Sequence, residues 1–263
     1  MSLRPVTAIA LNTLREILRD KVVYTFFVFA LVISLFGLIL GSLSVGQDVR
    51  MILDLGLFGI NTIGGIIAVF AGANLVYKEL EKKTCYLIFT KPVSAWQFIA
   101  GKYLGLSACL LILVAAMGIF LGLIVYFVDP SQAFFERAKW ISVSVLMVYL
   151  ELLVIIAAAE FFSTFASPIM SVIFTVSFWM IGHCSASLQE FSRLLTNPLL
   201  KQLSNLLYWL LPDLQSLTRA RYLIMYGQLP GSEFCLYLSA YIIAYAIILL
   251  VLAALVNEKR ELP

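Results

Sequence analysis

Six apolar runs, each close to the length that crosses a lipid bilayer as a helix, most constrain how this chain can fold. A membrane-crossing helix needs about 20 consecutive apolar residues. The chain of 263 residues is 62% hydrophobic and only 13% charged, which excludes an ordinary soluble domain. The runs also lack the alternation of a transmembrane β-barrel. The sequence therefore predicts an all-α polytopic membrane protein with six transmembrane helices, at approximately 22–43, 54–77, 104–128, 140–163, 168–185 and 235–256.

The distribution of lysine and arginine predicts the orientation of these helices. If the N-terminus is cytoplasmic, 11 of the 18 lysines and arginines fall on the inner side, as the positive-inside rule requires. We therefore expect one transmembrane domain over residues 1–263, with both termini in the cytoplasm and the bacterial inner membrane as its location. A mixed-charge segment precedes the first run and no small-residue cleavage site follows it, so no cleaved signal peptide is expected.

The segment before the first run, residues 4–21, has the pattern of an amphipathic helix. We expect this elbow helix to lie in the membrane interface, with its apolar face toward the acyl chains. It either anchors the first span or also flanks a cytoplasmic docking surface. Its apolar face comprises Val6, Ile9, Ala10, Leu14, Ile17 and Leu18.

A basic segment, residues 78–102, separates the second and third runs. Its apolar stretch 85–89 is too short to cross a membrane, and Pro92 disfavours helix in the residue before it. Ser94 can then cap a new helix, and we expect Lys102 on that helix to reach toward the lipid head groups. The positive-inside rule alone explains the charge of this segment, but not its apolar stretch or its turn.

This pattern resembles the first cytoplasmic loop of ABC-2 type transporter permeases, the membrane subunits of type 2 ATP-binding-cassette exporters, in which the loop forms a coupling helix. The resemblance covers the whole chain, because that family also has an elbow helix, six spans and an outer insertion. Two positions depart from the pattern: Lys83 stands where glycine is usual, and Ala95 stands where a basic residue is common. Gly101 and Lys102 complete the motif. The resemblance implies that an ATPase docks on Glu79, Glu81, Thr84, Leu87, Ile88, Pro92, Val93 and Ser94.

The chain has no phosphate-binding loop of its own. Such a loop reads G-x-x-x-x-G-K-[ST], whereas Gly101-Lys102 is followed by Tyr103 and has Trp96 at the first glycine position. We therefore expect no enzymatic activity and no cofactor bound by this chain. The resemblance implies a separate cytoplasmic ABC ATPase subunit that holds ATP and Mg²⁺, in a complex of two permeases and two ATPases surrounded by membrane lipid. No nucleic-acid partner is expected.

A long segment, residues 186–234, lies between the last two runs and is predicted to face the outside. Its apolar stretch 199–211 is too short to cross and is bounded by Pro198 and Pro212, so re-entrant or surface helices are expected. Related permeases place helices over the outer mouth of the pathway here. An interfacial hairpin held by an aromatic belt is equally compatible with the sequence.

Two carboxylates lie within the fourth predicted span. Glu151 follows Trp140 by 11 residues, which places it about 16 Å deep, so it should face protein or water. It is either a hydrogen-bonded packing residue or part of the pathway. Glu160 lies on the opposite helical face near the inner surface, and we expect it to reach the head groups or a basic residue of the elbow helix. His183, the only histidine, is expected at the outer interface.

The four cysteines have no metal-ligand or redox spacing, and we expect packed thiols. A disulfide between Cys184 and Cys235 stays open for an oxidising outer compartment.

These observations predict the permease subunit of an ABC exporter. Two alternatives stay open: an ion- or proton-coupled carrier in which Glu151 binds the coupling ion, and a non-transporting scaffold for assembly of a partner enzyme. The apolar walls of the predicted pathway do not distinguish a drug, lipid, peptide or polysaccharide cargo.

Overall fold

The computed structural model describes residues 4–41, 48–81, 94–129, 134–185, 197, 199–202, 204, 208, 211–225 and 231–260. All regular secondary structure in these residues is helical, as the sequence predicts. The helices are α1 (Arg4–Leu18), α2 (Lys21–Gly41), α3 (Asp48–Glu81), α5 (Ala95–Val128), α6 (Phe134–Ser163), α7 (Pro168–His183), α10 (Leu214–Met225) and α11 (Ser232–Arg260).

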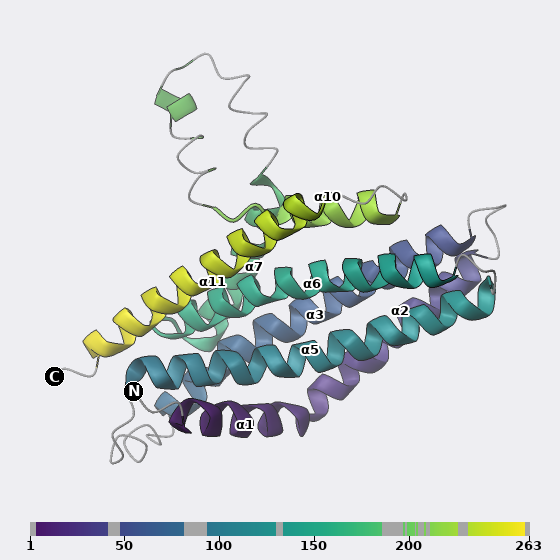
Figure 1. Cartoon of the computed structure of the whole chain (residues 1–263). Helices are drawn as coiled ribbons and strands as arrows, with labels where there is room; N and C mark the ends of the chain where they lie inside the picture. Colours follow the sequence, from purple (N-terminus) through teal and green to yellow (C-terminus); the bar gives the residue numbers. More distant parts are fainter. Residues whose placement is uncertain are drawn as a thin grey trace.

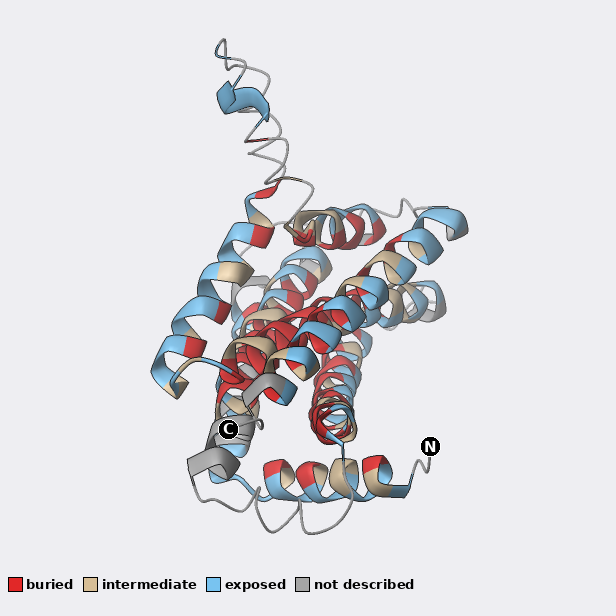
Figure 2. Ribbon diagram, turned by 90° about the vertical axis from the view of Figure 1, so that its left-hand side faces the viewer, coloured by how far each residue is buried: buried red, intermediate tan, exposed pale blue. Residues whose placement is uncertain are grey.

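Helix α6 is the central element of the bundle. It contacts α3, α5, α7, α10 and α11 (Figure 1). Its stretch from Leu152 to Ala159 is apolar on every side, and a helix of that kind is stable only when it is surrounded. Figure 2 shows buried residues concentrated inside the bundle and exposed residues on its outer faces. Many of the exposed side chains are large and apolar, which suits contact with lipid.

The ends of the helices fall into two groups. One end of the bundle, where the two termini lie, contains the start of α1, the end of α3, the start of α5 and the end of α11 (Figure 1). The end of α2, the start of α3, the end of α5 and the start of α6 lie at the other end. The start of α1, the end of α3, the start of α5 and the end of α11 therefore lie on one side of the bundle. That this side faces the cytoplasm stays a prediction.

Four of the six predicted spans are confirmed as helices long and apolar enough to cross a membrane. They are Val49–Asn74, Ala95–Val128, Glu136–Ser163 and Glu233–Glu258. The other two predicted spans contain shorter apolar helices, Phe27–Ile39 and Pro168–His183. At about 1.5 Å per residue, the 16 residues of α7 reach roughly 24 Å, less than the hydrocarbon core of about 30 Å. A six-span count stays a prediction.

A short turn joins the helices of the fourth and fifth predicted runs. Helix α6 ends at Ser163, and Ser167 is the N-cap of α7, with Pro168 in its first turn. Proline suits this position because its missing N–H would be unsatisfied there. The Ser171 hydroxyl donates to the carbonyl of Ala159 at 3.2 Å, which fixes the start of α7 against α6.

Helix α1 forms as predicted, but its buried face points toward protein. A Cβ added to Gly101 would lie 2.8 Å from the Ile9 side chain, and one added to Gly105 would lie 2.6 Å from the Ala10 carbonyl oxygen. Two glycines four residues apart let the backbones of α1 and α5 approach closely. Helix α5 therefore covers part of the face that was expected to meet acyl chains, and contact of the rest with lipid stays a prediction; the buried residues of α1 are Val6, Thr13 and Ile17.

Candidate functional site

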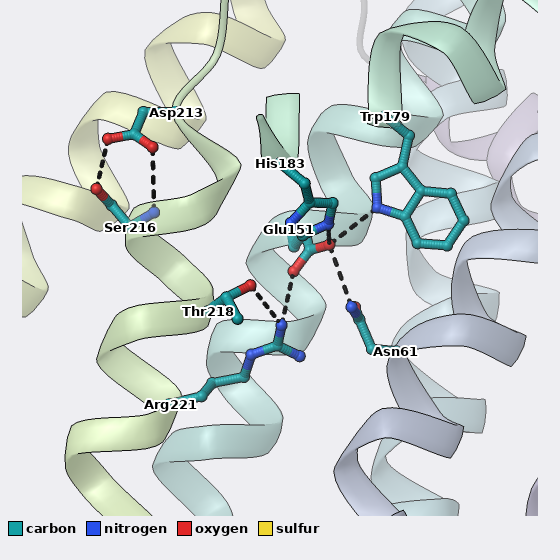
Figure 3. A network of polar contacts seen from close by, with 8 residues as sticks. All are labelled: Asn61, Glu151, Trp179, His183, Asp213, Ser216, Thr218 and Arg221. Carbon is teal, nitrogen blue, oxygen red and sulfur yellow. Dashed lines mark hydrogen bonds and ion pairs between the residues drawn. The ribbon is translucent and has the colours of Figure 1, made fainter. Parts of the chain in front are cut away.

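The side chain of Glu151 joins four helices in the interior of the bundle (Figure 3). It is fully buried near the middle of α6. Its Oε1 accepts from Asn61 Nδ2 of α3 at 3.3 Å and Trp179 Nε1 of α7 at 3.0 Å, and lies 2.9 Å from His183 Nε2. Its Oε2 accepts from Arg221 Nη2 of α10 at 3.3 Å. The expectation that Glu151 faces protein is confirmed.

Helix α10 is held in place by the side chain of Asp213, the residue before it. The Asp213 carboxylate accepts from the backbone N–H of Ser216 at 3.1 Å, an N-cap contact, and from the Ser185 hydroxyl at 2.8 Å. The Asp213 backbone N–H donates to the Tyr241 hydroxyl of α11 at 3.3 Å. One residue therefore ties the start of α10 to the chain that follows α7 and to α11.

The buried face of α10 directs Arg221 inward. Four fully buried residues of this face pack against α6 and α7, and Arg221 lies beside them. Arg221 Nη2 also donates to the Thr218 hydroxyl at 2.9 Å, one turn earlier. Burial lowers the pKa of Arg221, whereas attraction to Glu151 opposes that change. The four packing residues are Leu214, Leu217, Ala220 and Ile224.

Helix α7 supplies two of the groups around Glu151 because Trp179 and His183 are four residues apart and share a face. The Trp179 indole fits here only because Gly65 of α3 has no side chain: a Cβ on Gly65 would lie 2.3 Å from the ring. Since a carboxylate only accepts hydrogen bonds, we assign the proton of the His183–Glu151 contact to Nε2.

The contacts of Glu151 with Asn61, Trp179, His183 and Arg221 form a polar link between α3, α6, α7 and α10, the Glu151 link. Glu151 and Arg221 compensate each other's charge, and three further donors satisfy the carboxylate. A buried carboxylate with this many partners is held firmly and has little freedom to exchange a ligand. Among the described residues, no group of three His, Cys, Asp or Glu side chains could hold a metal ion. Cys109, Cys184 and Cys235 are free thiols.

A cavity of about 490 Å³ lies beside the link, between α3, α7 and α10. Asn61, Trp179, His183 and Arg221 belong both to the link and to the cavity wall. The cavity also has a carboxylate, Asp54, on its wall. Its remaining lining residues are Leu57, Phe58, Thr62, Met180, Cys184, Thr218 and Tyr222.

Glu160 is fully buried, and neither of its carboxylate oxygens has a hydrogen-bond partner among the described residues. The positive charge that acts on it belongs to Lys102 of α5, which is only 2% exposed and lies 5.3 Å from the centre of the Phe98 ring. Two predictions are therefore wrong. Lys102 does not reach outward to the head groups, because the close packing of α1 on Gly101 turns this face of α5 inward. Glu160 does not reach the head groups either, and the cation whose charge acts on it lies on α5 rather than on the elbow helix.

The structure places only part of the predicted coupling segment. Glu79 and Glu81 lie in the last turn of α3. Ser94 is confirmed as the N-cap of α5, where its hydroxyl and the Gln97 side chain form a capping box. The other candidate residues of this segment lie outside the described residues; they are Thr84, Leu87, Ile88, Pro92 and Val93.

The sequence predicted Glu151 as a site residue but not its partners. His183 was expected at the outer interface, and the structure instead brings its ring onto Glu151, because α7 packs along α6. Arg221 lies in the segment 186–234, which was predicted to face the outside. One signal could have singled it out: it adjoins an apolar stripe at positions 214, 217, 220 and 224, which predicts a helix with Arg221 at the edge of its buried face.

Comparison with known families gives the identity of this bundle. A family model described as ABC-2 family transporter protein matches residues 7–262. Comparison with curated proteins found no similar sequence. Members of this family are the membrane components of transporters and are not themselves catalytic. The apolar helices of the chain agree with a multi-pass membrane protein. Because the family model covers nearly the whole chain, the chain belongs to the ABC-2 transporter family.

Proposed function

We propose that this chain is the permease subunit of an ABC exporter, and that a separate cytoplasmic ATPase subunit supplies the energy. The observation that carries this proposal is the family match over residues 7–262 of a chain with four helices of spanning length. In the proposed complex, two copies of the permease pair in the bacterial inner membrane and two ATPases bind from the cytoplasm. The N- and C-termini face the cytoplasm.

The absence of a phosphate-binding loop from the sequence supports a separate ATPase. The only Gly-Lys pair, Gly101-Lys102, lies inside helix α5, where Lys102 is buried near Glu160. A phosphate-binding lysine must instead follow a glycine-rich loop whose backbone N–H groups surround the phosphates. We therefore assign ATP and Mg²⁺ to the partner subunit.

Residues 78–102 are the proposed docking segment for the ATPase. The helices on either side of it, α3 and α5, end and begin at the same end of the bundle (Figure 1). Helix α5 is packed closely on α1 through Gly101 and Gly105. A displacement of the docking segment that moves α5 would therefore also move α1. From α5, contacts continue to α6, to the Glu151 link and to α10.

The alternative of an ion-coupled carrier has less support. Such a carrier would use Glu151 to bind and release its coupling ion, but Arg221 and three other donors already contact this carboxylate. An ATP-driven exporter needs no coupling ion, so a structural Glu151 agrees with the proposed function.

Co-expression with the cognate ATPase tests the proposal. We expect a stable complex in detergent, and native mass spectrometry should give two copies of each subunit. Leu87→Asp and Ile88→Asp should each weaken the association, because a charge in the apolar stretch of the docking segment opposes burial against the partner. Both variants should still insert into the membrane, since residues 85–89 are too short to span.

The matched control is Leu199→Asp, which introduces the same charge at an exposed leucine of the predicted outer segment. It should leave the complex intact. Equal recovery of the ATPase with all three variants would place the docking surface elsewhere, and failure of the wild-type chain to bind any ABC ATPase would favour a non-transporting scaffold.

A further inference from the structure

The cavity beside the Glu151 link has the size and position of a ligand site. Its volume of about 490 Å³ lies within the range of roughly 300–1,000 Å³ that is usual for small-molecule pockets. It opens between α3, α7 and α10, near the start of α3 and the end of α7. In the proposed orientation, this places the cavity in the outer half of the membrane.

The charges on the cavity wall determine whether the cavity favours a cationic or an anionic ligand. Arg221 carries a positive charge, but its guanidinium is bonded to Glu151 and Thr218 and its side chain is only 9% exposed. Asp54 is an exposed carboxylic acid, and no described residue forms an ion pair or hydrogen bond with it. Glu151 compensates Arg221 and also contacts His183. Of the Arg221, His183 and Asp54 side chains that line the cavity, only the carboxylate of Asp54 therefore has no ion-pair contact with a described residue.

The rest of the wall suits the apolar body of a cation. Phe58 lies one helical turn after Asp54 on α3 and is 62% exposed, and Tyr222 faces the same cavity from α10 with 53% exposed. Trp179 completes an aromatic surface that includes side chains from all three helices. Aromatic faces attract cations, and the effect is strongest where water is excluded.

We propose that this cavity binds an organic cation with an apolar, ring-containing body, and that Asp54 determines its selectivity for positive charge. This inference rests on the proposed transport function, because it names the chemical class of the cargo. An anionic ligand would meet Asp54 without a compensating cation, since the charge of Arg221 is already paired.

Two probes of nearly the same shape and opposite charge test the proposal: tetraphenylphosphonium and tetraphenylborate. Binding is measured by equilibrium dialysis on the purified full chain in lipid nanodiscs, with empty nanodiscs as the blank. We expect saturable binding of tetraphenylphosphonium at one site per chain. Asp54→Asn should weaken it by about tenfold, the effect of losing one charge–charge contact at a partly exposed site.

Two further variants make the result specific. Asp54→Glu keeps the charge and should retain binding of the phosphonium. Glu233→Gln removes an exposed carboxylate at the start of α11, outside the cavity wall, and should leave binding unchanged. Equal affinity for both probes, an unchanged affinity in Asp54→Asn or no saturable binding would each overturn the proposal. The assay contains no ATPase, so any of these results leaves the proposed ATPase partnership to its own test.

Discussion

Replacing Arg221 with Met is expected to lower the free energy of unfolding by about 3–5 kcal/mol, the usual effect of removing one partner from a buried ion pair. Met fills a similar volume but cannot compensate Glu151, which has no solvent exposure. Glu151→Gln should also destabilise the chain, because it leaves the buried guanidinium of Arg221 without its anion. Both effects are measured by chemical or thermal unfolding in one detergent.

The double variant, Arg221→Met with Glu151→Gln, should be more stable than either single variant, since neither charge is then left unpaired. Arg219→Met provides the matched control: it removes an exposed arginine from the same helix and should change the stability by less than about 0.5 kcal/mol. Single variants as stable as the wild type, or a double variant less stable than both, would contradict a structural link through Glu151.

Gly105→Leu is expected to displace α1 from α5 and to lower the free energy of unfolding by about 1–3 kcal/mol, as overpacking commonly does. A side chain at this position would meet the Ala10 carbonyl oxygen and the Thr13 side chain, and a backbone atom cannot move aside without moving α1. Trypsin should therefore cleave after Arg15 faster in the variant, because a displaced helix exposes its backbone to the protease.

Gly122→Leu is the control on the same helix, since a Cβ at Gly122 meets nothing within 4 Å. It should neither lower the stability nor change the cleavage of α1. If the two leucine variants behaved alike, the close approach of α1 to α5 would play no part in holding the elbow helix.

Local patterns in the sequence predicted the helices well. Long apolar runs predicted the four helices of spanning length, and the spacing of apolar residues predicted α1. The cap at Ser94 was predictable because a capping residue acts on N–H groups only a few residues away. Each of these features depends on contacts within one helix or on the membrane itself.

Contacts between helices were not predictable in the same way. Glu151 meets Asn61, His183 and Arg221 across 90, 32 and 70 residues of sequence. Periodicity shows which side of a helix is buried, but not which neighbour covers it. Lys102 is an example. Its position near the expected membrane surface favoured an exposed ammonium group, but the close packing of α1 on Gly101 buries it.

In the proposed complex, transport uses ATP that another subunit hydrolyses, so ATP hydrolysis is the decisive measurement. Three samples are compared: the purified chain, its complex with the cognate ATPase, and the complex in which the phosphate-loop lysine of that ATPase is replaced by alanine. We predict hydrolysis only in the second sample. Hydrolysis by the purified chain, or by the complex with the altered ATPase, would contradict a separate ATPase subunit as the source of energy.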